Sequence, residues 1–135
     1  MTARLVPVPS GRVDTVWPTV EPLIEKALAR GCGGYEPRDV RADLKDNTAQ
    51  LWLAVDGKEL LAAMVGRIAI YPRHKVYLLY LLAGRERERW LFLLDYLEPG
   101  ARKRGCKALV VEGRKGWARV LEGWTETHVV LRKEL

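Results

Sequence analysis

Apolar and polar positions follow two different periods along this chain, and the change of period predicts its helices and strands. From about Val13 to Arg30 the apolar residues recur at the spacing of an amphipathic helix that ends at a glycine. Pro18 and Pro22 fall early in this stretch, so its first turn is expected to begin later than the pattern alone suggests. A second, short helix is predicted from Glu36 through Asp46.

The period then changes to the alternation that is typical of strands. Two turns divide this part into three strands, which predicts an antiparallel meander. The predicted strands are Gln50–Val55, Glu59–Tyr71 and Lys75–Leu82, joined by turns at Asp56-Gly57 and Pro72-Arg73-His74. The weakly alternating segment Ala3–Val8, which ends in prolines, is predicted as an edge strand.

The rest of the chain alternates between the helical and the strand pattern. A helix is predicted over Glu88–Arg104, with Pro99-Gly100 kinking or interrupting its last turns. The predicted elements after it are a buried strand at Ala108–Val111, a brief helix at Lys115–Leu121 and a final strand at Thr125–Leu131. The passage from Lys75 to Val111 is the one place where a parallel crossover is expected, and it would be right-handed. Ligands in such folds usually lie at the strand ends beside the helix start.

The element order and some short sequence motifs resemble the GNAT fold, that of the Gcn5-related N-acetyltransferases, over nearly the whole chain. Ala101–Cys106 resembles the A-x-x-x-G end of that family's long central helix, and Ala108–Val111 resembles the strand that follows it. Gly123-Trp124 resembles the G-F step before the last strand, and Leu131–Leu135 resembles the common ending. The expected fold class is therefore α/β (α+β), a single GNAT-like domain over residues 1–135 with a mixed central sheet and flanking helices.

The segment that would bind a cofactor departs from the family pattern. Active members carry a Q/R-x-x-G-x-G/A loop for the acetyl-CoA pyrophosphate, and here its three defining positions hold Arg85, Glu88 and Trp90. Arg85 fits, but Glu88 adds a carboxylate and Trp90 is bulky where a phosphate needs close approach of the backbone. No G-x-G occurs between Gly84 and Gly100. The resemblance thus implies a degenerate cofactor site, with no cofactor expected.

No catalytic or metal-binding residue is assigned from the sequence. Many members use a tyrosine four residues before the glycine of the G-F step, where this chain has Arg119, a poor proton donor near neutral pH. Glutamates and two histidines occur, but none has a partner at a recognisable spacing, and the chain has no G-x-S-x-G, P-loop or metal-ligand pair. Cys32 and Cys106 are expected to be reduced thiols in the core.

Composition favours one compact domain with a moderate positive charge. The chain has 135 residues, of which 48% are hydrophobic, and its net charge is +6. From Gly84 onward 12 basic and 8 acidic residues contribute +4 of that charge, so an anionic partner is expected on this half. The candidate residues for an interface or anion site are Arg102, Lys103, Arg104, Lys107, Arg114, Lys115, Trp117 and Trp124. The basic ones either form a solvated face that suits a helix C-terminus or dock DNA or an acidic protein.

The sequence thus predicts a non-catalytic GNAT-like protein that acts as a structural or binding component. It resembles small virion-associated proteins of tailed bacteriophages, which implies a place in the virion or the host cytoplasm and partners among virion or host proteins. Oligomers and nucleic acid stay open as partners, whereas no membrane span and no signal peptide are expected. The alternative is an active acyl-CoA-dependent N-acetyltransferase that holds acetyl-CoA through Arg85, Arg87 and Arg89.

Overall fold

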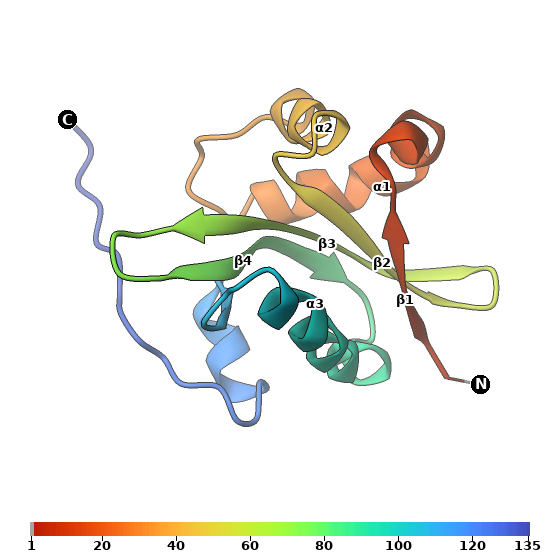
Figure 1. The fold of residues 1–135 in the computed structure, drawn as a ribbon. Helices are drawn as coiled ribbons and strands as arrows, with labels where there is room; N and C mark the ends of the chain where they lie inside the picture. The colour runs from red at the N-terminus through yellow and green to blue at the C-terminus, as the bar shows by residue number, and fades with distance from the viewer. Residues whose placement is uncertain (1) are drawn as a thin grey trace.

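Five strands form one sheet that lies between two layers of helices (Figure 1). The computed structural model describes residues 2–135, except for the side chain of Lys115. The strands are β1 (Arg4–Val8), β2 (Gln50–Asp56), β3 (Glu59–Ile70), β4 (Lys75–Gly84) and β5 (Leu109–Val111). The helices are α1 (Val13–Leu28), α2 (Pro37–Lys45) and α3 (Glu98–Lys103). Short 3₁₀ helices are η1 (Ser10–Arg12), η2 (Arg87–Arg89), η3 (Leu91–Leu97) and η4 (Lys115–Arg119).

The strands lie side by side in the order in which they occur in the sequence. Neighbours from β1 to β4 pair antiparallel, and β5 pairs parallel with β4. The expected edge strand, the meander and the parallel crossover are therefore confirmed, as is the α+β class with a mixed sheet.

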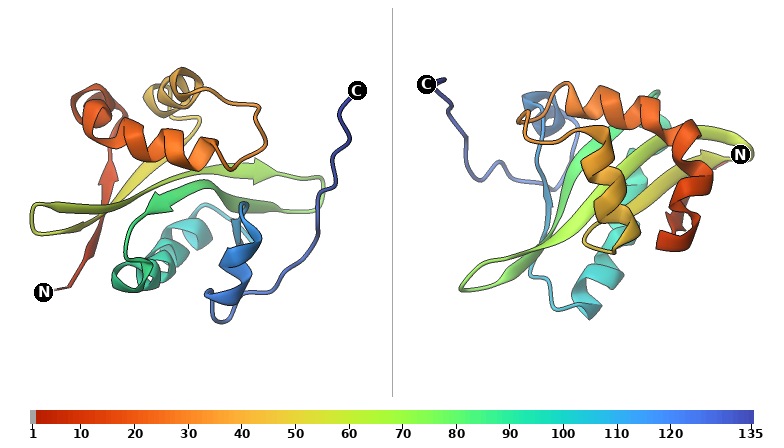
Figure 2. Two further views of the ribbon diagram at one scale, coloured as in Figure 1. Left: turned by 180° about the vertical axis from the view of Figure 1, so that it is seen from behind. Right: turned by 90° about the horizontal axis from the view of Figure 1, so that it is seen from above.

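Each face of the sheet carries its own hydrophobic cluster. Helices α1 and α2 cover one face, and η3, α3 and η4 cover the other (Figure 2). On the first face α1 buries Val13, Trp17, Val20 and Ile24, which recur every three or four residues and so share one side of the helix. The sheet is thus covered on both sides, and its long strands β3 and β4 bury half or more of their residues.

The two prolines near the start of α1 do not delay the helix, contrary to the expectation. Helix α1 begins at Val13 and includes both Pro18 and Pro22. The prolines are exposed and four residues apart, so both lie on the solvent side of the helix. Water can bind the carbonyl groups that their missing N–H groups leave free, while the buried side of α1 keeps the helix against the sheet.

The predicted helix over Glu88–Arg104 is wrong in its first ten residues. The structure has the 3₁₀ helices η2 and η3 there, and α-helix only in α3. Pro99 has no N–H to donate to the carbonyl of Asp95, so an α-helical ladder cannot run through it. Pro99 instead lies in the first turn of α3, where its missing N–H is tolerated.

The predicted final strand at Thr125–Leu131 is also absent from the described residues. These residues are exposed and carry no regular structure. Their composition suits a strand, but a strand needs a neighbour to take its hydrogen bonds, and here none lies alongside.

The two cysteines are both free, but only one of them is in the core. Cys106 is buried, as expected, whereas Cys32 is exposed. Cys32 follows the end of α1 in a glycine-rich connection, where its Sγ accepts a hydrogen bond from the N–H of Gly34 at 3.4 Å. The prediction of a core thiol was therefore wrong for Cys32.

The side chain of Tyr77 extends across one face of the sheet, beneath α3. Tyr77 of β4 is buried and lies over Gly66 of β3, so that its hydroxyl reaches β2. There it accepts a hydrogen bond from Trp52 Nε1 at 2.9 Å and donates one to Gln50 Oε1 at 3.0 Å. A Cβ atom on Gly66 would lie 2.5 Å from the Tyr77 ring, so this position has no room for a side chain.

We expect Gly66→Ala to lower the free energy of unfolding by roughly 1–3 kcal/mol, the usual cost of overpacking a core. The new methyl group must displace a ring that two hydrogen bonds hold in place. Urea unfolding measures the change, and Gly11→Ala is the control because nothing lies within 4 Å of a Cβ atom there. Equal effects of the two substitutions would contradict the steric account.

Candidate functional site

The candidate site lies where β5 leaves β4. Three residues of each strand pair, the last pair being Leu79 with Val111. The N–H of Glu112 donates to the carbonyl of Leu79 at 3.0 Å, after which the chain leaves the sheet. Residues 81–84 of β4 therefore have a strand partner only on the β3 side.

A β-bulge marks the same point in β4. Leu79 lies opposite Gly66 and Leu81 lies opposite Val65, so Tyr80 has no partner residue in β3. Beyond the bulge, Arg85 donates its N–H to the carbonyl of Leu61 in β3 at 3.0 Å. Backbone groups alternate in direction along a strand, so those of Leu82 and Gly84 point away from β3, toward the open side.

A cavity of about 1360 Å³ occupies this open side. The end of α1, the unpaired part of β4, β5, η4 and the chain after η4 line it. Its charged lining residues are Lys26, Arg30, Arg87, Arg102, Lys107, Arg114 and Arg132 against Glu86, Glu88, Glu98, Glu112 and Glu126. The two signs are mixed, but both glutamates of the segment after β4 face this cavity.

Two of the three arginines after β4 are bound to carboxylates outside the cavity lining. Arg89 Nη2 lies 2.9 Å from Asp56 Oδ2 and 3.0 Å from Glu59 Oε1, both in the turn region of the β2–β3 hairpin. Arg85 also pairs with Glu59, and both arginines contact Glu86. We call these five residues the hairpin ion cluster. Arg87, in contrast, lines the cavity.

Glu86 and Trp90 fix the backbone of this segment. Glu86 adopts the left-handed conformation (φ 51°, ψ 55°), which is uncommon for a residue other than glycine. Trp90 is 1% exposed, and its Nε1 donates to the carbonyl of Arg85 at 2.9 Å. Its ring also packs edge-to-face against Trp117, with the centroids 6.2 Å apart. The contacts of Trp90 therefore hold the backbone of the segment after β4 in place.

The structure brings part of the predicted basic set to the cavity. Arg102, Lys107, Arg114, Trp117 and Trp124 line it. Arg102 also pairs with Glu98 at 3.0 Å, and the guanidinium of Arg114 lies 5.8 Å from the Trp117 ring centroid.

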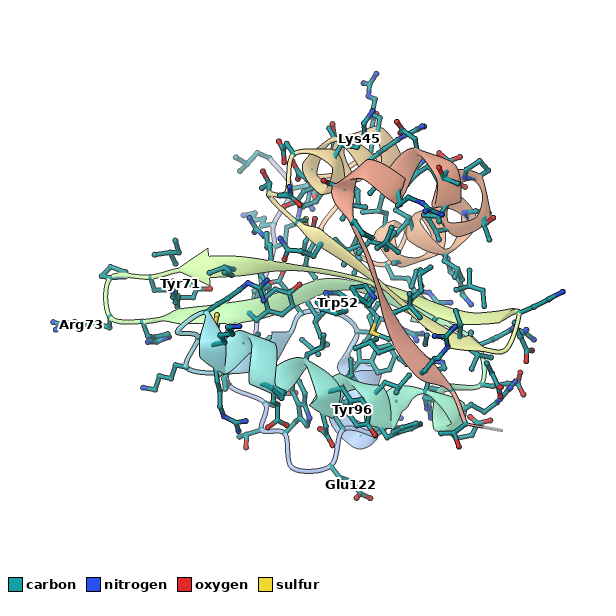
Figure 3. The ribbon with its side chains drawn as sticks, turned by 45° about the vertical axis from the view of Figure 1, so that its right-hand side comes forward. Lys45, Trp52, Tyr71, Arg73, Tyr96 and Glu122 are labelled. Atoms are coloured by element: carbon teal, nitrogen blue, oxygen red, sulfur yellow. The ribbon has the colours of Figure 1, made fainter. Side chains whose placement is uncertain are left out.

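The other predicted basic residues lie elsewhere. Arg104 borders a separate cavity of about 50 Å³ that Trp52 and Tyr96 also line; Figure 3 shows these two aromatic residues on the sheet and on the layer beneath it. Lys103 is exposed, and the side chain of Lys115 lies outside the described residues. Arg119, at the position of the family's tyrosine, is exposed and is not part of the cavity lining.

Sequence reasoning missed an aromatic and cationic cluster on the α1 side of the cavity. Tyr80 lines the cavity, its ring centroid lies 5.3 Å from that of Tyr35, and the guanidinium of Arg67 lies 5.4 Å from it. Burial raises the pKa of Tyr80, so its hydroxyl keeps its proton near neutral pH. The β-bulge that places Tyr80 here leaves no signal in the sequence.

Asp56 and Glu59 were missed as partners of Arg85 and Arg89 because they are far from these arginines in the sequence.

Among residues 2–135, no three histidine, cysteine, aspartate or glutamate side chains gather as metal ligands. No helix there is long and apolar enough to cross a membrane.

Comparison with solved structures shows which fold this is. An aminoglycoside acetyltransferase from an uncultured soil metagenomic sample superposes with a TM-score of 0.72 over 98% of this chain and 95% of its own, at 11% identity. A ribosomal-protein-alanine N-acetyltransferase from Brucella melitensis biovar Abortus gives 0.68 over 98% and 100%, at 12% identity. A GNAT family acetyltransferase from Staphylococcus aureus gives 0.66 over the whole of both chains, at 12% identity. No protein-family model matches the chain, and no curated protein matches it in sequence. The chain thus has the GNAT acetyltransferase fold, as its element order predicted.

Glu59→Gln is expected to make the protein less sensitive to acid. The hydrogen bond from Arg89 holds the pKa of Glu59 below its ordinary value of 4.5. Because the folded-state pKa is the lower one, the carboxylate stabilises the fold above the unfolded-state pKa, and this contribution is lost as the pH falls through the folded-state pKa. Urea midpoints measured from neutral to acid pH should therefore differ most at neutral pH and converge in acid.

The control for this experiment is Glu122→Gln, which changes an exposed glutamate in the turn after η4 (Figure 3). Its midpoints should follow those of the wild type at every pH. A Glu59→Gln curve that runs parallel to the wild type across the acid range would contradict the assigned role of the hairpin ion cluster.

Proposed function

We propose that this chain is a binding protein with the acetyltransferase fold, and that it does not turn over acyl-CoA. The arrangement of charges at the end of β4 carries the proposal. Glu86 and Glu88 line the cavity, whereas Arg85 and Arg89 are held by carboxylates of the β2–β3 hairpin. A diphosphate would therefore meet the carboxylate of Glu88 and a single arginine, Arg87, on this segment, because Glu86 is itself paired with Arg85 and Arg89.

The backbone of the same segment supports the proposal. An anion is bound well by the free N–H groups at the start of an α-helix. Here the N–H of Arg89 donates to the carbonyl of Glu86 at 2.8 Å, and that of Trp90 donates to the carbonyl of Arg87 at 3.1 Å. The α-helix α3 begins only at Glu98. The N–H groups of Arg89 and Trp90 are thus hydrogen-bonded within the 3₁₀ turns and are not available to an anion.

The chemistry of the cavity favours a protein partner with acidic groups. Lys107 and Arg114 supply positive charge on the β5 side, next to the Arg102–Glu98 pair. Trp117 and Trp124 supply aromatic surface beside them. Tryptophan and arginine are the residues that most often anchor protein interfaces. The proposal includes the setting that the resemblance implies, a component of a tailed-phage particle, for which mass spectrometry of purified particles is the test.

Titration calorimetry with acetyl-CoA is the direct test of the proposed loss of cofactor binding. We expect no saturable heat at millimolar acetyl-CoA, which corresponds to a binding free energy weaker than about −4 kcal/mol. Desulfo-CoA, which lacks the thiol but keeps the diphosphate, should give the same result. Micromolar binding of either compound would overturn the proposal.

A second candidate function is an acetyl-CoA-dependent N-acetyltransferase. Two observations favour it: the unpaired part of β4 beside a large cavity, and the acetyltransferases among the similar solved structures. In this case Arg87 is the arginine of the segment that would meet the diphosphate, because it lines the cavity.

The second candidate predicts thioester cleavage that depends on Arg87. If a thiol-release assay with a panel of amines shows turnover, Arg87→Ala should lower kcat/KM at least tenfold, about the effect of one lost charge-assisted contact. Arg73→Ala is the control, since Arg73 lies at the tip of the β3–β4 hairpin (Figure 3). No turnover with any amine, or equal activity of both variants, would contradict this assignment.

A further inference from the structure

The two edges of the sheet differ in how they are protected. At one edge β1 contains Pro7, which has no N–H and so discourages a further strand. At the other edge β5 consists of Leu109, Val110 and Val111, with neither a proline nor a charge. The N–H of Tyr77 donates to the carbonyl of Ala108, and the N–H of Glu112 donates to that of Leu79. The backbone groups of Leu109 and Val111 consequently point outward, away from β4.

The same chain carries a segment, Thr125–Leu131, that has the composition of a strand but pairs with no strand of the described residues. Val129, Val130 and Leu131 are 70%, 79% and 90% exposed. Such a run of apolar side chains in an extended segment is rarely left in water. Figures 1 and 2 show the end of the chain running away from the rest of the molecule.

We propose that this segment, Thr125–Leu131, pairs antiparallel with the outer edge of β5 in a second copy of the chain. The sequences match in one register: Leu109-Val110-Val111 reads the same as Val129-Val130-Leu131 taken backward. Each apolar residue then meets an identical residue. Outside this core the register brings Glu112 opposite His128 and Arg114 opposite Glu126, which are complementary pairs, and Lys107 opposite Lys133, which are both exposed.

One hydrogen bond favours pairing of β5 with the segment of a second copy over pairing with the segment of the same chain. Arg132, the neighbour of Leu131, donates a hydrogen bond to the carbonyl of Cys32, in the connection between α1 and α2. This contact holds the segment at the α1–α2 connection, whereas pairing in the matched register requires Arg132 to lie beside Ala108. Each molecule has one open edge and one unpaired segment, so two molecules related by a twofold axis satisfy both at once.

The oligomeric state tests the proposal first. Light scattering after size exclusion should give the mass of two chains for the wild type, and the mass of one chain for Val130→Lys, which places a charge inside the paired strands. Ile70→Lys is the matched control, because Ile70 is equally exposed at 80% but lies at the end of β3. A monomeric wild type, or a dimer that Val130→Lys leaves intact, would overturn the proposal.

Disulfide trapping then tests the register and distinguishes the two copies. In the proposed register Val110 and Val130 form a non-hydrogen-bonded pair, whose Cα atoms are about 4.5 Å apart, within the range of a disulfide. In a Cys32→Ser, Cys106→Ala background, a Val110→Cys chain mixed with a Val130→Cys chain should give a covalent dimer of the two. Replacing the second chain by Glu122→Cys should abolish it. If the Val110→Cys, Val130→Cys double variant closes a disulfide only within one chain, the segment pairs with its own β5 and the proposal fails.

Discussion

Beyond Leu79, β4 exchanges hydrogen bonds with β3 alone, because β5 contributes three residues and the chain leaves the sheet at Glu112. The bulge at Tyr80 changes the course of β4 at the same point. A long buried strand thus ends with one side open, and the cavity forms there. The position of the candidate site follows from this single mismatch in strand length.

The charges around the cavity depend on a second hairpin that is distant in sequence. Asp56 and Glu59 flank the turn between β2 and β3, and β3 passes directly beside the end of β4. Their carboxylates attract Arg85 and Arg89 and hold them on that side of the sheet. The cluster thereby removes positive charge from the cavity, while Trp90 fixes the backbone between the two arginines. The acid-sensitive pairing and the weak anion binding that we infer have the same physical cause.

Much of the fold could be predicted from the sequence because its long elements have clear periods. The buried stripe of α1 and the alternation in β2 to β4 identify these elements without knowledge of their neighbours. The segment 88–97 could not be predicted correctly, since its apolar spacing fits both α and 3₁₀ turns and only Pro99 separates them. The same limit applies to Thr125–Leu131, where composition indicates a strand but the partner is not encoded nearby.

The candidate site was predictable only in part, for a related reason. The lack of glycine between Gly84 and Gly100 is visible in the sequence, and so is the group of basic residues near α3. The partners of Arg85 and Arg89 and the contact between Tyr80 and Arg67 depend on register and on a bulge, which bring together residues far apart in the chain.

The backbone and the charges of the cavity make different demands on a ligand. The outward backbone groups of Leu82 and Gly84 can bind any ligand with an extended, amide-containing chain, and both a peptide and the pantetheine arm of coenzyme A have one. The charges separate these two ligands, since Glu88 repels a diphosphate but leaves an uncharged main chain unaffected. Under the proposed function a peptide satisfies both demands, whereas coenzyme A satisfies only the first. The binding role that we propose, in place of acyl transfer, is compatible with the acetyltransferase fold because the scaffold and the chemistry are set by different residues.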